Sequence, residues 1–229
     1  MMKRNFRISS YNIRKARGLD NRRKPERTLE VINRLNADIV VLQEADMRLG
    51  ARAPAIGRGM IARETDFELV EVSKNGTSLG WHGNAVLVRR GINVDSIEHI
   101  DLPGMEPRGA VHFKIGGNFE LSVVATHLGL LRRHRVAQLK AICDATSGDK
   151  NTIIAGDMNE WSATKGFAPL ADRFMVHSPG RSFHARRPIA GLDRFAISGG
   201  IQFLDAGVAQ DALARRASDH LPIWCDISV

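Results

Sequence analysis

The sequence has few of the features that mark secreted or membrane-spanning proteins. Its 229 residues include only two cysteines, Cys143 and Cys225, which lie far apart and form no motif. We therefore expect neither a disulfide scaffold nor a cysteine zinc site, and we expect a reducing, cytoplasmic location. No apolar run approaches the ~20 residues that a transmembrane helix needs. The basic N-terminal segment is not followed by an apolar stretch, so no secretory signal is expected.

Acidic residues are outnumbered by basic ones. The chain has 33 Lys and Arg against 25 Asp and Glu, a formal net charge of +8, and 25 of the 33 basic residues are arginine. The planar guanidinium group suits phosphate oxygens, so this bias favours a phosphate-bearing partner. A solvated basic surface explains the same composition equally well. Composition alone leaves both interpretations open.

The length and composition are those of a folded globular protein. Hydrophobic residues make up 43% and charged residues 25% of the chain, values that exclude a disordered or fibrous protein. A chain of this length can bury a large core without disulfides. No linker, repeat or break in composition divides it, so we expect a single domain over residues 1–229.

Apolar, β-branched runs predict many strands, and amphipathic spacing predicts few helices. Helices are expected at Pro25–Asn36 and Arg133–Thr146, a surface loop at Ala45–Met60, and a hairpin turn at Gly116-Gly117. This balance favours two sheets packed face to face with helices outside over a doubly wound parallel sheet. The expected strands are Phe6–Asn12, Asp38–Glu44, Phe67–Val72, Asn84–Arg90, Ala110–Ile115, Leu121–His127, Thr152–Asp157, Leu192–Ser198, Ile201–Ala206 and Pro222–Val229.

Unusual polar residues fall at the ends of the expected strands. Taken singly, each is explained by turn or capping chemistry. Together they are not, because carboxylates beside buried strands are costly to desolvate unless they are paired or bound to a cation. Oxygen-rich ligands of this kind suit a hard cation such as Mg²⁺. The residues are Asn12, Glu44, His127, Asp157, Asn159, Asp193, Asp219 and His220.

The order of these motifs resembles the endonuclease/exonuclease/phosphatase family over nearly the whole chain. GDMN and SDHLP are the most specific pieces, and LQE alone would be weak. The resemblance implies an α/β fold, a four-layer α/β sandwich of two mostly antiparallel sheets, with the active site at one edge of the sheets. The motifs are YNIR (Tyr11–Arg14), LQE (Leu42–Glu44), GNAVLV (Gly83–Val88), ATHL (Ala125–Leu128), GDMN (Gly156–Asn159), LDRF (Leu192–Phe195) and SDHLP (Ser218–Pro222).

The same resemblance implies a divalent-metal centre and an attacking water. Glu44 is expected to bind Mg²⁺ or Mn²⁺, with Asn12 and Asp219 as further metal ligands. Asp157 is expected to orient or deprotonate the water. The implied reaction is in-line attack of water on a phosphoester while the metal polarises the phosphoryl group.

Four further catalytic roles follow from the resemblance. Asn159 is expected to hold the scissile phosphate. His220 is expected to lie against the phosphorus, with Asp193 fixing its tautomer and ring position. His127 is expected to donate a hydrogen bond to a phosphate oxygen and to stabilise the charge that develops there.

Three residues near the motifs are predicted to bind substrate phosphate. Arg108 follows a turn and precedes an apolar strand, Asn84 belongs to GNAVLV, and Arg135 follows ATHL. Phosphate contacts of this type position a ligand without reading its sequence. For the arginines that begin the expected helix after ATHL, a solvated helix face is an equally good explanation.

The sequence indicates the type of reaction more clearly than the class of substrate. His127 stands where the branch that repairs abasic DNA usually has tyrosine, and the chain has one tyrosine, Tyr11, so that branch is disfavoured. Nucleic acid is the first expectation, because phosphate neutralisation dominates nucleic-acid affinity. The alternative is a phospholipid or small-phosphoester hydrolase, sphingomyelinase- or inositol-phosphatase-like, with its basic surface against an anionic membrane. A remote alternative is a non-catalytic phosphate-binding protein. No obligate protein partner is inferred.

Overall fold

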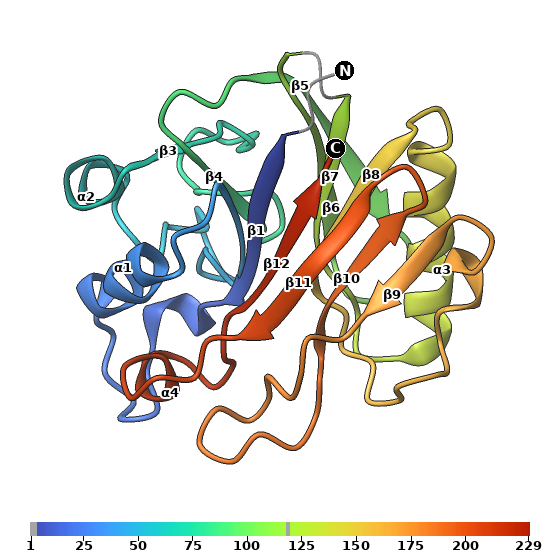
Figure 1. The fold of residues 1–229 in the computed structure, drawn as a ribbon. Helices are drawn as coiled ribbons and strands as arrows, with labels where there is room; N and C mark the ends of the chain where they lie inside the picture. Colours follow the sequence, from blue (N-terminus) through green and yellow to red (C-terminus); the bar gives the residue numbers. More distant parts are fainter. Residues whose placement is uncertain (1–3, 118–119) are drawn as a thin grey trace.

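The computed structural model describes residues 4–117 and 120–229, which form two six-stranded sheets packed face to face (Figure 1). The first sheet has the order β11 (Gln202–Val208), β12 (Ile223–Ser228), β1 (Asn5–Asn12), β2 (Ile39–Gln43), β4 (Ala85–Arg89), β3 (Phe67–Leu69). The second has the order β5 (Val94–Leu102), β6 (Arg108–Ile115), β7 (Leu121–His127), β8 (Asn151–Asp157), β10 (Asp193–Ser198), β9 (Phe174–His177).

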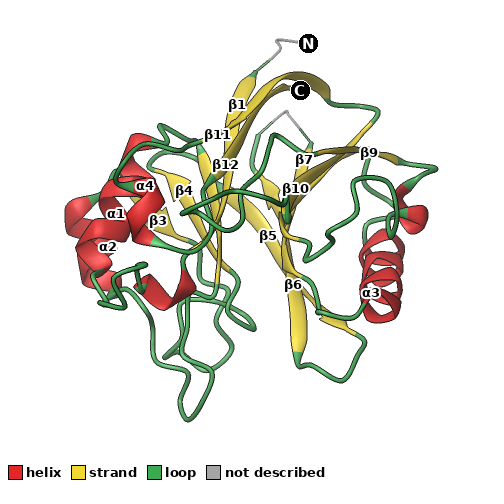
Figure 2. Cartoon of the chain, turned by 90° about the horizontal axis from the view of Figure 1, so that it is seen from below, coloured by secondary structure: helices red, strands yellow, loops and turns green. Residues whose placement is uncertain are grey.

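Helices cover the outer face of each sheet, which completes four layers (Figure 2). On the first sheet lie α1 (Pro25–Arg34), α2 (Arg58–Glu64) and α4 (Ala214–Ala217), and on the second lies α3 (Arg132–Ala145). Two short 3₁₀ turns, η1 (Arg14–Ala16) and η2 (Ala168–Leu170), complete the elements. In the described part of the chain, no helix is both long enough and apolar enough to cross a membrane.

Neighbouring strands pair antiparallel except in two pairs. β1 pairs with β2 in parallel, and β7 pairs with β8 in parallel. A parallel pair needs a long crossover, and α1 and α3 supply the two crossovers. The predicted α/β sandwich of two mostly antiparallel sheets is therefore confirmed.

Three apolar clusters bind the layers together. Between the sheets, Ile8 and Val41 of the first sheet pack in one cluster with Val123 and Phe195 of the second. A second cluster joins the outer face of the first sheet to α1 and α2, and a third joins the second sheet to α3. Because both faces of β2 are covered, its run IVVLQ is buried throughout instead of alternating.

Some elements depart from the sequence prediction. β5 and β9 were not expected, and the predicted loop Ala45–Met60 ends inside α2. β5 has the sequence VDSIEHIDL and pairs only with β6, so it is an edge strand with charged residues on its exposed positions. Such a strand lacks the apolar run that marks a buried one. β6 and β7 pair antiparallel as predicted, but their connection includes residues 118–119, which lie outside the described part.

Candidate active site

The carboxyl ends of the central strands bring the predicted site residues to one edge of the sandwich. Asn12 ends β1, His127 ends β7 and Asp157 ends β8. In the ladder of the second sheet, His127 and Asp193 are both register partners of Asp157. Since register partners share a face of the sheet, these three side chains are brought together by strand pairing alone.

The carboxylate of Asp157 is the centre of this edge, and the residue is 1% exposed. Its Oδ2 accepts a hydrogen bond from Asn12 Nδ2 at 3.0 Å, and its Oδ1 accepts one from the backbone N–H of Asn159 at 3.0 Å. Oδ2 also lies 3.5 Å from His127 Nε2 and 3.7 Å from His220 Nε2. The Asn12 bond crosses from the first sheet to the second, so the site lies at the junction of the two sheets.

His220 and Asp193 form a buried pair. His220 Nδ1 lies 2.8 Å from Asp193 Oδ2, and the Ser182 hydroxyl donates to the same oxygen at 2.5 Å. Burial disfavours the imidazolium form, but the carboxylates of Asp193 and Asp157 outweigh it and raise the pKa of His220 to about 10. His220 is therefore a cation held between two carboxylates.

His127 lies near the same carboxylate oxygen as His220 but differs from it in charge. Burial lowers the pKa of His127 to about 4, despite the nearby carboxylate of Asp157. The ring is neutral at pH 7, so one nitrogen donates and the other accepts. The two histidines at Asp157 thus offer one fixed cation and one neutral donor.

Two of the predicted metal ligands, Glu44 and Asp219, form ion pairs with basic side chains. Lys15 pairs with the Glu44 carboxylate, and Arg14 Nε lies 3.3 Å from Asp219 Oδ2. Glu44 has a left-handed φ of 53°, a conformation that is costly outside glycine and typical of functional sites. Burial alone would raise the pKa of Glu44, but the hydrogen bond from Lys15 and its charge lower it below the usual value. This carboxylate is ionised and already faces a cation.

Two sets of side chains could bind a metal ion, and their donor atoms suit a divalent cation unequally. Among the described residues, Asp157, Asp193 and His220 have ligand atoms within 4.8 Å of one another. In that group Asp193 and His220 already satisfy each other, and the positive charge of His220 opposes a second cation. Glu44 and Asn12 offer oxygen donors without a histidine, the donor chemistry that Mg²⁺ and Mn²⁺ prefer. The donor set at Glu44 therefore fits a hard divalent ion better.

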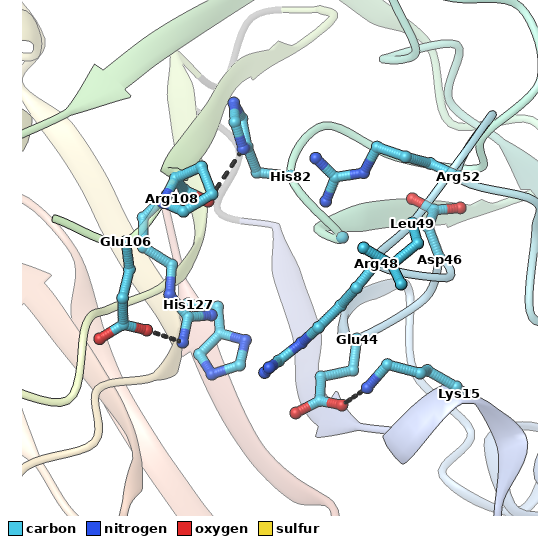
Figure 3. A pocket seen from close by; sticks show the side chains of 12 residues that line it. Lys15, Glu44, Asp46, Arg48, Leu49, Arg52, His82, Glu106, Arg108 and His127 are labelled. Atoms are coloured by element: carbon cyan, nitrogen blue, oxygen red, sulfur yellow. Dashed lines mark hydrogen bonds and ion pairs between the residues drawn. The ribbon is translucent and has the colours of Figure 1, made fainter.

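A cavity of about 300 Å³ opens beside Glu44 and His127 (Figure 3). Its walls come from the loop after β2, the turn before β4 and the turn before β6. A volume of this size is at the lower end of small-ligand sites. The lining residues are Lys15, Glu44, Asp46, Arg48, Leu49, Arg52, His82, Gly83, Glu106, Pro107, Arg108 and His127.

The three predicted phosphate-binding residues have different surroundings. Arg108 lines the cavity, and its guanidinium donates to Glu106 at 2.9 Å. Asn84 is buried and donates to the backbone oxygen of Gly109 at 2.8 Å, which links the two sheets. Arg135, 5% exposed, pairs with Glu160 at 2.7 Å. All three residues therefore have internal partners, and their phosphate-binding role stays a prediction.

Sequence reasoning missed several residues of the site. Ser182 and Phe183 come from the loop before β10, and the Phe183 ring lies 4.9 Å from the ring of His220. No local motif marks them, because they reach the site through the chain reversal before β10. Arg48 and Arg52 fall in the segment Ala45–Met60, which was predicted as a surface loop. Lys15 directly follows YNIR, and that adjacency was the one available signal.

The chain is similar to known proteins in sequence and in fold. The chain is 28% identical to the uncharacterised protein YbhP of Escherichia coli K12, over 97% of this chain and 96% of that protein. The fold is similar to D. rerio TDP2 complexed with single-strand DNA product (TM-score 0.72, 16% identity, 97% of this chain and 98% of that chain). It is also similar to the Bacteroides thetaiotaomicron mannosyl-6-phosphatase Bt3783 (TM-score 0.73, 16% identity, 97% and 99%).

These structural similarities show the fold, and the sequence shows the family. The profile of the Endonuclease/Exonuclease/phosphatase family matches residues 9–220, from within β1 to His220. The match therefore includes the whole edge built around Asp157. The chain belongs to the endonuclease/exonuclease/phosphatase family, whose members are phosphoesterases.

Proposed function

We propose that this protein is a divalent-metal-dependent phosphodiester hydrolase that acts on nucleic acid. The observation that carries the proposal is the set of groups around one carboxylate. Asp157 Oδ2 accepts a hydrogen bond from the side-chain amide of Asn12. The same oxygen lies within 3.7 Å of the neutral His127 and the charged His220. A buried carboxylate with donors on several sides is suited to hold a water molecule for attack on phosphorus.

Asp157 is the proposed general base. It orients the attacking water and takes its proton, while Asn12 and the backbone N–H of Asn159 keep the carboxylate in place. Asn159 Nδ2 donates to the Leu128 carbonyl at 2.8 Å, which leaves its second N–H for a phosphate oxygen. The left-handed φ of 52° at Asn159 fits a functional role at this position.

The two histidines stabilise the negative charge of the reacting phosphate. His220 supplies a positive charge, and Asp193 with Ser182 holds its ring. His127 is neutral and donates a hydrogen bond to a non-bridging oxygen. Donors already positioned in a water-poor site stabilise the transition state without reorganisation.

Glu44, with Asn12 and Asp219 nearby, is the proposed holder of Mg²⁺ or Mn²⁺. When bound, the ion supplies Lewis-acid polarisation of the phosphoryl group. The contact of Lys15 with Glu44 supports this assignment, because the carboxylate is ionised and already accommodates a positive charge.

An aromatic surface beside His220 supports nucleic acid as the substrate. Trp161 is 60% exposed, and its ring lies 6.0 Å from that of Phe183, which contacts His220. Bases stack on exposed aromatic rings of this kind, typically with a contribution of about 1–3 kcal/mol per base. The similar fold of TDP2 with a single-strand DNA product points to the same class. The second candidate is a small-phosphoester hydrolase, supported by the modest cavity and the similar fold of the mannosyl-6-phosphatase.

One panel of assays tests the proposal. The purified protein is given single- and double-stranded DNA, RNA, a phospholipid vesicle and mannose 6-phosphate, with Mg²⁺, with Mn²⁺ or with EDTA. We expect the highest kcat/KM on a nucleic acid, loss of activity in EDTA, and recovery on adding Mg²⁺ or Mn²⁺. Faster hydrolysis of mannose 6-phosphate would favour the second candidate, and full activity in EDTA would overturn the metal requirement.

A further inference from the structure

The cavity beside Glu44 is lined by more basic side chains than carboxylates. Four basic side chains line it: Lys15, Arg48, Arg52 and Arg108. Lys15 pairs with Glu44, and Arg108 pairs with Glu106. Within residues 4–117 and 120–229, Arg48 and Arg52 make no ion pair and no side-chain hydrogen bond. The cavity therefore has two guanidinium groups without a hydrogen-bond or ion-pair partner.

The acids of the cavity are already satisfied. Glu106 accepts hydrogen bonds from Arg108 and from the backbone N–H of Leu130. Asp46 is buried and accepts the backbone N–H groups of Leu79 at 2.6 Å and Gly80 at 3.1 Å. The lining thus has four basic side chains against three carboxylates, and within the described part of the chain the hydrogen bonds of these carboxylates go to groups other than Arg48 and Arg52.

The side chains of both arginines are directed into the cavity. Figure 3 shows the Arg48 guanidinium between His127 and Glu44, and the Arg52 guanidinium on the side of His82. Both residues come from the segment that follows β2, so one stretch of chain supplies the two charges. Guanidinium groups at such a wall can bind phosphate oxygens through two parallel hydrogen bonds.

We propose that this cavity is a second phosphate subsite, in which Arg48 and Arg52 bind a phosphate group of the substrate other than the one cleaved. This inference rests on the proposed function, which puts the scissile phosphate at Asp157. Asp157 and His220 do not line the cavity, whereas Glu44 and His127 belong to both places. A phosphate bound between Arg48 and Arg52 is thus adjacent to the reacting one and distinct from it.

The subsite defines a substrate class. The preferred substrate is a phosphodiester with a second phosphate next to the scissile one, such as an oligonucleotide end that carries a terminal phosphate. A phosphodiester without a neighbouring phosphate would leave the two arginines unpartnered. Each charge-assisted contact to the second phosphate is expected to raise kcat/KM by about tenfold.

The experiment compares three dinucleotides that share one scissile bond: TpT, and the same dinucleotide with a 5′-terminal phosphate (pTpT) or a 3′-terminal phosphate (TpTp). For wild type we expect pTpT or TpTp to exceed TpT in kcat/KM by about tenfold or more. Arg48→Gln and Arg52→Gln are each expected to lower this ratio by about tenfold. The matched control is Arg63→Gln, because Arg63 is an exposed arginine on α2 that does not line the cavity.

A binding measurement separates failure of the subsite from failure of the proposed function. Calorimetry without added metal compares thymidine 3′,5′-bisphosphate with thymidine 5′-monophosphate. Tighter binding of the bisphosphate, reduced in Arg48→Gln and Arg52→Gln but not in Arg63→Gln, supports the subsite even if no dinucleotide is hydrolysed. Hydrolysis of TpT with no preference for either phosphorylated form, or equal binding of the two nucleotides, would overturn the subsite.

Discussion

The two halves of the active site differ in how their side chains are held. The half built around Asp157 comes from strand ends of the second sheet and from the segment before β12 that carries His220. Its members Asp193 and His220 are buried and hydrogen-bonded to each other. The half around Glu44 comes from the loop after β2. There Arg48 is exposed and Arg52 is half-buried, and neither has an ion-pair partner among the described residues.

The difference follows from what positions each half. Strand register sets the spacing of His127, Asp157 and Asp193, and the surrounding core resists displacement. Loop residues are held by fewer contacts and tolerate change more readily. Reaction chemistry needs fixed distances, whereas recognition of a flexible phosphate chain does not. We therefore propose that the strand-held half positions the attacking water, and that Arg48 and Arg52 of the loop-held half select the substrate, while Glu44 of the loop-held half would hold the metal.

The largest effects are expected in the strand-held half. Asp157→Asn removes the proposed base and His220→Ala removes the proposed cation, and each is expected to lower kcat/KM by at least about a thousandfold. Because both residues act in one step, the double variant should be little worse than either single variant. Measured kcat/KM values for all four proteins test this. Losses that add on a logarithmic scale would show that the two residues do not share a step.

The next largest effect is expected on the free energy of unfolding, from the buried ion pair between Arg135 and Glu160. Arg135 and Glu160 are both buried, and Arg135 also donates to the carbonyls of Gly129 and Leu130, just beyond His127. Glu160→Gln leaves a buried guanidinium without its counter-charge, so we expect unfolding to become easier by about 3 kcal/mol. The matched control is Asp144→Asn in the exposed pair with Lys140, expected to change stability by less than about 0.5 kcal/mol.

The same pair predicts a pH dependence of stability. Burial would raise the pKa of Glu160, but hydrogen bonds from Arg132 and Arg135 outweigh it and hold the pKa at about 2. The unfolded value is about 4.3, so the folded state favours the ionised form. Its stabilisation is complete above pH ~4.3 and is lost as the pH falls towards 2. Urea unfolding of wild type and Glu160→Gln should therefore converge below pH ~4, and a constant gap from pH 7 to pH 3 would contradict this.

The fold and the strand-held half were the predictable parts of this protein. β7 and β8 are apolar runs that end in His127 and Asp157, and these polar residues mark the sheet edge. The edge strand β5 was missed because its exposed positions carry charges. Pattern alone also cannot tell whether an arginine faces a cavity or an internal carboxylate, so the pairing of Arg135 with Glu160 could not be predicted.

A moderate effect is expected from the residue that supports Asp193. The Ser182 hydroxyl donates to the carboxylate oxygen that also holds His220. Ser182→Ala removes this bond and leaves the pair itself intact, so we expect kcat to fall by about tenfold while KM changes little. Ser182→Thr, which keeps the hydroxyl, is expected to recover part of the loss. A change confined to KM would show that Ser182 acts on substrate binding and not on the position of His220.

The smallest effect is expected at the tip of the loop-held half. Leu49 is 87% exposed, whereas Leu128, the residue after His127, is 1% exposed and belongs to the apolar cluster under α3. Leu49→Ala removes no buried contact, so its free energy of unfolding should stay within about 0.5 kcal/mol of wild type. Leu128→Ala opens a cavity beside the strand-held half and should cost about 2–5 kcal/mol. Equilibrium unfolding of the two variants measures the contrast directly. If Leu49→Ala were as costly as Leu128→Ala, the loop would be held as firmly as the strand ends, and the division between a rigid and an adaptable half would be wrong.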